Sequence, residues 1–151
     1  MNYQEILQSH SPAETEAVGE ALAARILSGE LPPFVALYGD LGVGKTAFVR
    51  GFVRLISPAA TVRSPTFALV NEYRKGTLPV FHFDMYRIED EDDLYSIGFE
   101  DYLEKEGICL VEWSENIPYA LPAHYLRVEI VKDDAANTNS RKIKLEEIKL
   151  C

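Results

Sequence analysis

The residues from Gly39 to Thr46 fit the spacing G-x-x-x-x-G-K-[ST] of a phosphate-binding P-loop. An apolar run at 34–38 precedes this segment and is typical of a buried strand, and apolar residues at helical spacing follow it over about 45–56. The motif requires this order of strand, glycine-rich loop and helix, because the loop N–H groups and the helix N-terminus then surround a phosphate. The sequence therefore predicts a site for a nucleoside triphosphate.

Two side chains of this segment have distinct expected roles. The ammonium of Lys45 is expected to reach the β- and γ-phosphates, and the hydroxyl of Thr46 is expected to ligate Mg²⁺. The residues predicted to contact the nucleotide here are Asp40, Leu41, Gly42, Val43, Gly44, Lys45, Thr46 and Ala47.

Two further apolar runs end in a carboxylate, which a P-loop needs for Mg²⁺ and for the attacking water. The run 80–84 ends in Asp84, and the run 108–112 ends in Glu112. Ligands of parallel α/β sheets lie at the carboxyl ends of the strands, so both carboxylates could face the triphosphate. We predict that Asp84 and Glu112 serve in catalysis and metal binding. Their spacing does not single out the residue that positions water.

Three other positions have more than one interpretation. Thr66, which follows Ser64 and Pro65, could sense the γ-phosphate or Mg²⁺ from a switch-like loop, or the segment could be a plain turn. Arg87 could bring a cation to the phosphates or pair with an acidic neighbour in 89–93. Trp113, the only tryptophan, is either a core residue or a contact for nucleotide or partner.

The remaining pattern predicts one α/β domain over residues 1–151. A capping box at Ser11 to Glu14 starts a helix over about 12–28. The interleaved elements favour a P-loop NTPase fold, with a mixed central sheet, helices on both faces and antiparallel hairpins at the edges. The other predicted elements are strands at 68–74, 78–84, 108–113, 125–131 and 142–146 and helices at 90–95 and 99–106.

Composition narrows the location of the chain. No run approaches the ~18 apolar residues of a membrane span, and the N-terminal residues lack the pattern of a secretory signal. Cys109 and Cys151 lie far apart and are not expected to form a disulfide. These features favour a reducing, cytoplasmic location without membrane contact.

The formal net charge of −9 disfavours direct binding of RNA, because basic side chains that neutralise phosphates supply most of the affinity of nucleic-acid binders. Arg50, Arg54 and Arg63 nevertheless leave a local basic patch open. If RNA takes part in the biology of this chain, we expect a partner to hold it. The three histidines are dispersed and are interpreted as surface or core residues rather than as zinc ligands.

The motifs together resemble the TsaE family, also called YjeE. The resemblance covers nearly the whole chain, and the combination is more specific than the P-loop alone. One mild departure is Ser114, where the family often has proline. The motifs that carry the resemblance are Gly39–Thr46, Ser64-Pro65-Thr66-Phe67, Asn71-Glu72-Tyr73, Phe81-His82-Phe83-Asp84-Met85-Tyr86-Arg87 and Val111-Glu112-Trp113.

The resemblance implies a bacterial P-loop ATPase of tRNA threonylcarbamoyladenosine biosynthesis. TsaE proteins work with TsaB and TsaD, which build the modification on the adenosine next to the anticodon. By this resemblance the chain would hydrolyse ATP with Mg²⁺, would reset or drive the TsaB–TsaD complex, and would meet tRNA only through that complex. A weak self-association of the chain stays open.

The resemblance also implies roles for single residues. Thr46 and Glu112 would contact Mg²⁺, and Asp84 would be needed for activity. Thr15, in the first helix, would lie near the nucleotide, and Arg141 would approach the base.

Two alternatives to an ATPase acting on a protein complex remain. One is a small-molecule or nucleoside kinase, which shares the P-loop but needs an acceptor pocket and a closing lid. The other is a nucleotide-dependent binding switch in which hydrolysis is incidental. The absence of an N-K-x-D segment leaves guanine specificity without support.

Overall fold

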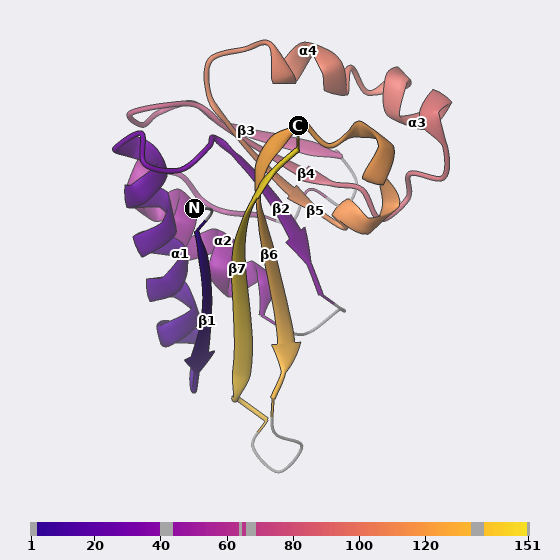
Figure 1. Cartoon of the computed structure of the whole chain (residues 1–151). Coiled ribbons are helices and arrows are strands. Elements are labelled where there is room, and N and C mark those ends of the chain that lie inside the picture. The colour runs from indigo at the N-terminus through magenta and orange to yellow at the C-terminus, as the bar shows by residue number, and fades with distance from the viewer. Residues whose placement is uncertain (1–2, 40–43, 64, 66–68, 134–137, 151) are drawn as a thin grey trace.

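The computed structural model describes residues 3–39, 44–63, 65, 69–133 and 138–150. Within these residues, seven strands form one sheet in the order β1-β7-β6-β2-β5-β4-β3 (Figure 1). The strands are β1 (Gln4–Ser9), β2 (Phe34–Tyr38), β3 (Val70–Tyr73), β4 (Val80–Asp84), β5 (Ile108–Glu112), β6 (His124–Lys132) and β7 (Arg141–Lys149). The helices are α1 (Pro12–Leu27), α2 (Lys45–Ile56), α3 (Glu91–Ser96) and α4 (Phe99–Leu103), with 3-10 turns η1 (Ser114–Asn116) and η2 (Pro118–Ala120).

The sheet is parallel at its centre and antiparallel at its edges. Strand β2 pairs in parallel with β5 and β6, and β4 pairs in parallel with β5. The pairs β3–β4, β6–β7 and β1–β7 are antiparallel. This arrangement confirms the predicted mixed sheet with hairpins at the edges, and it brings the ends of β2, β4 and β5 to one side.

Helices α1 and α2 cover one face of the sheet. Their side chains Leu22, Phe48 and Phe52 pack on the apolar residues of the central strands and are almost fully buried. Serine at the N-cap of α1 accepts a hydrogen bond from the N–H of Glu14, as the capping box predicts. The predicted bounds of both helices agree with the structure to within one residue.

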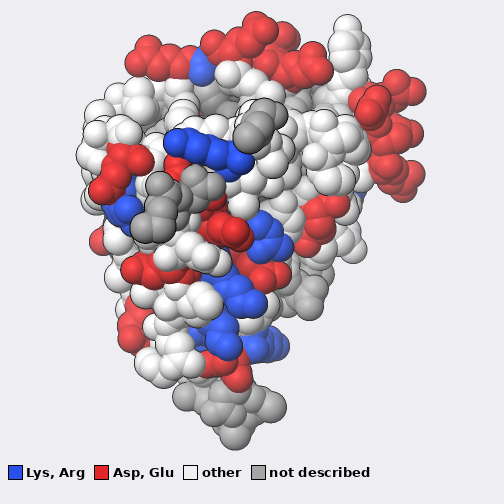
Figure 2. All heavy atoms as spheres, viewed as in Figure 1, with Lys and Arg blue, Asp and Glu red and all other residues white. Residues whose placement is uncertain are grey.

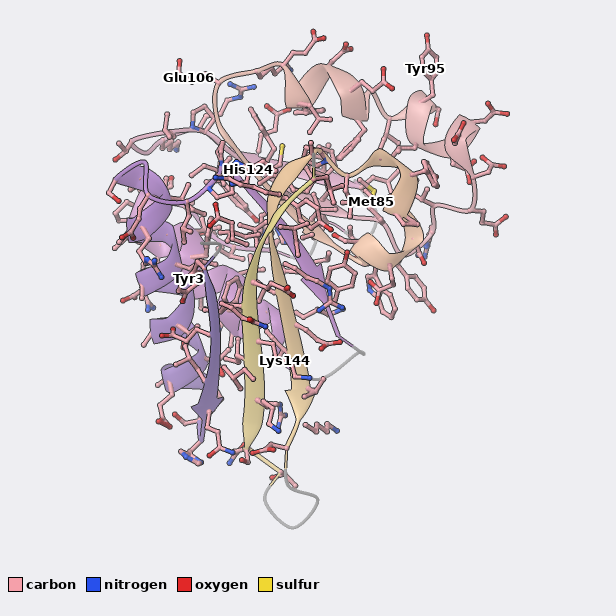
Figure 3. The ribbon with its side chains drawn as sticks, viewed as in Figure 1. Tyr3, Met85, Tyr95, Glu106, His124 and Lys144 are labelled. Atoms are coloured by element: carbon pink, nitrogen blue, oxygen red, sulfur yellow. The ribbon has the colours of Figure 1, made fainter. Side chains whose placement is uncertain are left out.

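The opposite face is covered only in part. Over β4 and β5 an aromatic core includes Phe83 and Phe99, whose rings meet edge to face at 5.2 Å. Helices therefore lie on both faces, as predicted. Over β6, β7 and β1 this face is open and carries charged side chains of both signs (Figure 2), among them Lys144 on β7 (Figure 3).

Helices α1 and α2 touch through glycine. A Cβ atom added at Gly19 would lie 2.3 Å from the carbonyl oxygen of Phe48, and one at Gly51 would lie 2.0 Å from the carbonyl oxygen of Glu16. The two backbones therefore approach more closely than any side chain would permit. This contact fixes the position of α2, and with it the segment where α2 begins.

The structure corrects two expectations. Strand β1 was not predicted; it pairs with β7 along the edge of the sheet. The helix expected over 99–106 ends at Leu103, where acidic side chains at Glu104 and Glu106 oppose the helix dipole and Gly107 adopts φ 152°. In the part of the chain that is described, no helix combines the length and the apolar character needed to cross a membrane.

Candidate functional site

The start of α2 has the backbone geometry that the glycine pattern requires. Gly44 precedes the helix with φ 105° and ψ 16°, and Gly39 follows β2 with φ 141°. Side chains rarely adopt these angles, so glycine is needed at both positions. Thr46, in the first turn, is exposed, which leaves its side chain accessible to a ligand. A strand thus ends just before the segment and a helix begins just after it, as expected.

Lys45 combines a charge with burial. The residue is 6% exposed, and within the described part of the chain its Nζ atom has no hydrogen-bond partner. The ammonium instead lies 4.2 Å from the centroid of the Trp113 ring, a cation–π contact. A buried ammonium without hydrogen bonds is costly, and phosphate oxygens would supply the partners that it lacks.

Trp113 owes its place to an uncommon backbone conformation. Its φ of 58° lies in the left-handed region, which residues other than glycine rarely adopt, at the junction of β5 and η1. The ring also meets that of Tyr86 at 5.0 Å. The amide of Asn116 donates to the carbonyl of Met85 at 2.9 Å and ties the loop after β4 to η1. The structure therefore places Trp113 against the predicted phosphate-binding lysine.

The two predicted carboxylates are neighbours across the sheet. Asp84 and Glu112 occupy paired positions at the ends of the parallel strands β4 and β5. Asp84 is 8% exposed, and its Oδ1 atom accepts a hydrogen bond of 2.9 Å from the N–H of Tyr86. The structure thus brings both carboxylates to one edge of the sheet, as expected from the sequence.

A histidine joins this pair without having been predicted as a site residue. The Nε2 atom of His82 lies 2.5 Å from Oε2 of Glu112, and His82 is 1% exposed. On its other side, Nδ1 lies 3.5 Å from the hydroxyl of Tyr73. The strand period of two places His82 on the same face as Asp84, and this was the signal in the sequence that could have identified it.

A small hollow gathers three of the other predicted nucleotide contacts. Its volume is about 50 Å³, and Thr15, Ala47 and Arg141 line it together with Gly44. Thr15 is buried, and its hydroxyl lies 2.7 Å from that of Ser9. The hollow is too small to enclose a base, so a nucleotide would lie against it rather than inside it.

Five predicted site residues cannot be placed. Asp40, Leu41, Gly42, Val43 and Thr66 lie outside the described residues. Among the residues that are described, no group of three or more His, Cys, Asp or Glu side chains could hold a metal ion. A hydroxyl and one or two carboxylates nevertheless fit Mg²⁺, which takes its remaining ligands from water and substrate phosphates.

Comparison with known proteins gives one consistent family. Residues 9–143 match the family model described as "Threonylcarbamoyl adenosine biosynthesis protein TsaE". A tRNA threonylcarbamoyladenosine biosynthesis protein TsaE from Bacillus subtilis is 40% identical over 120 residues, which cover 80% of this chain and 73% of that protein. The TsaE protein of Haemophilus influenzae is 43% identical over 104 residues, which cover 68% of this chain and just under two thirds of that protein, 66%.

Two further matches extend over more of the chain. The TsaE protein of Rickettsia bellii is 35% identical over 131 residues, which cover 86% of this chain and 87% of that protein. A crystal structure of Bacillus subtilis YdiB superposes with a TM-score of 0.78 at 30% identity. The superposition covers 98% of this chain and 88% of that one.

Proposed function

The chain belongs to the TsaE family of tRNA threonylcarbamoyladenosine biosynthesis proteins, and we propose that within this pathway it is a Mg²⁺-dependent ATPase. The observation that carries the proposal is the buried ammonium of Lys45, which lies at the start of α2 without a hydrogen-bond partner among the described residues. An ATP triphosphate is the ligand that fits a lysine placed there by a strand, a glycine-rich segment and a helix.

The proposed mechanism gives each side chain of the site a task. Lys45 moves from the ring of Trp113 to the β- and γ-phosphates and stabilises the charge that develops on their oxygens. Thr46 and Glu112 would hold Mg²⁺, which would supply further positive charge to the triphosphate. Asp84, fixed by the N–H of Tyr86, is the second acidic group. Thr66 is proposed to sense the γ-phosphate.

The remaining predicted contacts hold the nucleotide. We propose that the backbone of Asp40 to Gly44 surrounds the phosphates and that Ala47 packs beside them. Thr15 and Arg141 would lie beside the nucleoside, and the hollow that they line together with Gly44 supports this placement.

We further propose that the chain acts on a complex of TsaB and TsaD rather than on tRNA itself. The acidic charge of the chain supports this division, since a strongly acidic surface repels a polyanion. Hydrolysis would then drive the partner complex between its catalytic cycles. The tRNA would be held by that complex.

The test is ATP hydrolysis by the purified chain, alone and with TsaB and TsaD from the same source. We expect strong stimulation by the two proteins and loss of turnover in Lys45→Ala and Glu112→Gln. A rate that is independent of TsaB and TsaD, with no association between the proteins, would reject the proposed partners.

Two further measurements separate the two alternatives, the kinase and the binding switch, from the ATPase. Transfer of phosphate to an added metabolite instead of water would identify a kinase. A binding switch would show itself if Asp84→Ala stopped turnover yet preserved tRNA modification in cells, because nucleotide binding alone would then suffice.

A further inference from the structure

A chain of buried polar groups lies beneath the predicted metal-binding carboxylate. Glu112, His82 and Tyr73 come from three neighbouring strands, β5, β4 and β3. The rings of His82 and Tyr73 lie nearly parallel, with an interplanar angle of 28° and centroids 6.2 Å apart. The side chain of His82 is 2% exposed and that of Glu112 is 13% exposed, so their contact is largely shielded from water.

The chemistry of the end groups orders the protons along this chain. An ionised carboxylate only accepts hydrogen bonds, so the 2.5 Å contact with Oε2 of Glu112 requires the proton on Nε2 of His82. In the neutral ring Nδ1 is then an acceptor, and the hydroxyl of Tyr73 is the donor that faces it at 3.5 Å.

The hydroxyl of Tyr73 extends the chain to the backbone before the predicted switch-like segment. It accepts from the N–H of Arg63 at 3.2 Å and also lies 3.3 Å from the carbonyl oxygen of Arg63. Its single proton is therefore shared between that carbonyl and His82. One hydrogen-bonded path therefore runs from the backbone of Arg63 through Tyr73 and His82 to Glu112.

We propose that His82 is a positioning residue for the metal site: its Nε2–H holds the Glu112 carboxylate by Oε2 in the orientation that binds Mg²⁺, and Tyr73 fixes the imidazole. A free glutamate side chain has three torsions, and ordering them at the moment of metal binding costs entropy. Hydrogen bonds to metal-ligating groups remove this cost, and their loss typically weakens metal binding roughly 10- to 100-fold. The proposal rests on the proposed Mg²⁺-dependent nucleotide site.

A purely structural histidine would give different results from a positioning one. If His82 only filled the core, its replacement would lower stability and would weaken nucleotide binding with and without metal alike. If His82 positions Glu112, its replacement lowers only the affinity for the metal ion. The measurement must therefore separate metal affinity from nucleotide affinity.

Two substitutions at His82 form a matched pair for this purpose. In His82→Gln the side-chain amide can place an N–H where Nε2 lies, whereas in His82→Asn the shorter side chain cannot reach Glu112. We would measure Mn²⁺ binding by electron paramagnetic resonance with a non-hydrolysable ATP analogue, and binding of the same analogue in EDTA. Melting temperatures would report on folding.

We expect His82→Asn to weaken Mn²⁺ binding roughly 10- to 100-fold and His82→Gln to stay within about threefold of the wild type. Analogue binding in EDTA should be the same in all three proteins. Equal Mn²⁺ affinity in His82→Asn and wild type would overturn the proposal, as would a parallel loss with and without metal. If the wild type showed no metal-dependent nucleotide binding, the proposed function itself would fail.

A measurement on the unaltered protein covers the case in which His82→Asn does not fold. Nitrogen NMR of the imidazole distinguishes a protonated Nε2 from a protonated Nδ1. We expect the proton on Nε2 and a change of its resonance when Mg²⁺ and the analogue are added together. A proton on Nδ1, or a resonance that does not change when Mg²⁺ and the analogue are added, would contradict the positioning role.

Discussion

Lys45 and Trp113 form the contact in the site that a nucleotide would have to break. The ammonium lies 4.2 Å from the ring centroid, and the described surroundings offer its Nζ atom no hydrogen bond. Because Trp113 is the only tryptophan of the chain, tryptophan fluorescence reports on the surroundings of this one ring. We expect a saturable change of emission when ATP draws the ammonium away.

The matching substitution is Lys45→Met, which keeps an unbranched side chain one atom shorter and removes the charge. It should abolish the change of emission and weaken ATP binding roughly 10- to 100-fold, since hydrogen bonds to charged groups contribute about 1.5–3 kcal/mol. Lys105→Met is the control, because Lys105 also lies over a ring, that of Tyr102 at 4.4 Å, but just after the end of α4. ATP binding by equilibrium dialysis without any change of emission would contradict the idea.

Which residues of the site could be predicted depended on how local their signal is. Lys45 is identified by a contiguous motif, and Asp84 and Glu112 each end an apolar run, so neighbouring residues suffice to find them. The strand period places His82 on the same face as Asp84, but its contact with Glu112, thirty positions later, depends on β4 lying beside β5. Apolar periodicity does not encode which strands become neighbours.

At the scale of elements, the contact of α1 with α2 sets the position of the predicted phosphate-binding segment. Gly51→Ala would place a Cβ atom 2.0 Å from the backbone carbonyl of Glu16, which cannot rotate away as a side chain could. Helix propensity favours alanine by up to ~1 kcal/mol, but overpacking costs about 3 kcal/mol or more here, so the steric term wins. We expect a melting temperature lower by roughly 5–10 °C.

Gly29→Ala is the control for this substitution. Gly29 has no atom near the position of an added Cβ, although its φ of 83° is unfavourable for alanine. We expect a cost of only about 1–2 kcal/mol from the left-handed backbone. Urea unfolding of both variants measures the difference, and equal losses would show that the helix contact is softer than the geometry implies.

A second prediction concerns the edge strand β1, which one carboxylate ties to the sheet. Glu147 accepts hydrogen bonds from the N–H of Tyr3 at 3.1 Å and from His124, whose Nε2 lies 2.6 Å from Oε2. The hydrogen bond from His124, followed by that from Tyr3, holds the pKa of the Glu147 carboxyl below its ordinary value. A lowered pKa in the folded state stabilises the fold above the unfolded pKa, about 4.3, and this contribution disappears as the pH falls through the folded value.

Glu147→Gln should therefore lower the free energy of unfolding by about 1 kcal/mol near pH 7. The difference from the wild type should shrink as the pH falls below about 4, because both side chains are then uncharged. Urea unfolding between pH 7 and pH 3 checks the trend, and hydrogen exchange of the Leu7 amide checks that β1 is the element that loosens. A difference that is constant with pH would mean that charge plays no part.

Helices α1 and α2 were predictable because their caps, glycines and apolar spacing are local. Strand β1 was not, since its residues do not alternate: Ile6 is 60% exposed, while Leu7 packs against the core. Its stability comes from pairing with β7, about 140 positions later in the chain. Such a strand is specified by its partner rather than by its own pattern.

At the scale of the molecule, the negative charge is concentrated in one segment. Residues 89–106 carry nine carboxylates and one lysine, a net charge of −8 out of −9 for the whole chain. These residues form α3, α4 and their flanks, where Figure 2 shows an acidic surface along the top and at the upper right, interrupted by uncharged side chains. Tyr95 projects from it and is 81% exposed (Figure 3). This pole of the molecule should repel tRNA.

Several basic side chains outside this segment form ion pairs with carboxylates. Arg54, part of the basic patch that the sequence left open, binds Glu16 at 3.0 Å and also Glu20. On the open face of the sheet, Lys144 lies 3.8 Å from Glu129. Basic side chains that are paired in this way are less available for phosphates, and with a net charge of −9 the chain is expected to bind nucleic acid weakly at most.

We therefore expect the purified chain to retain no tRNA at micromolar concentration and 0.15 M salt. Filter binding of labelled tRNA would test this with three samples: the chain alone, the TsaB–TsaD complex as the positive control, and the chain mixed with that complex. The combined sample should bind tRNA with the salt dependence of TsaB–TsaD alone, because this chain would add no phosphate contacts. Saturable binding by the chain alone, with affinity falling steeply as salt rises, would show that it contacts the RNA directly.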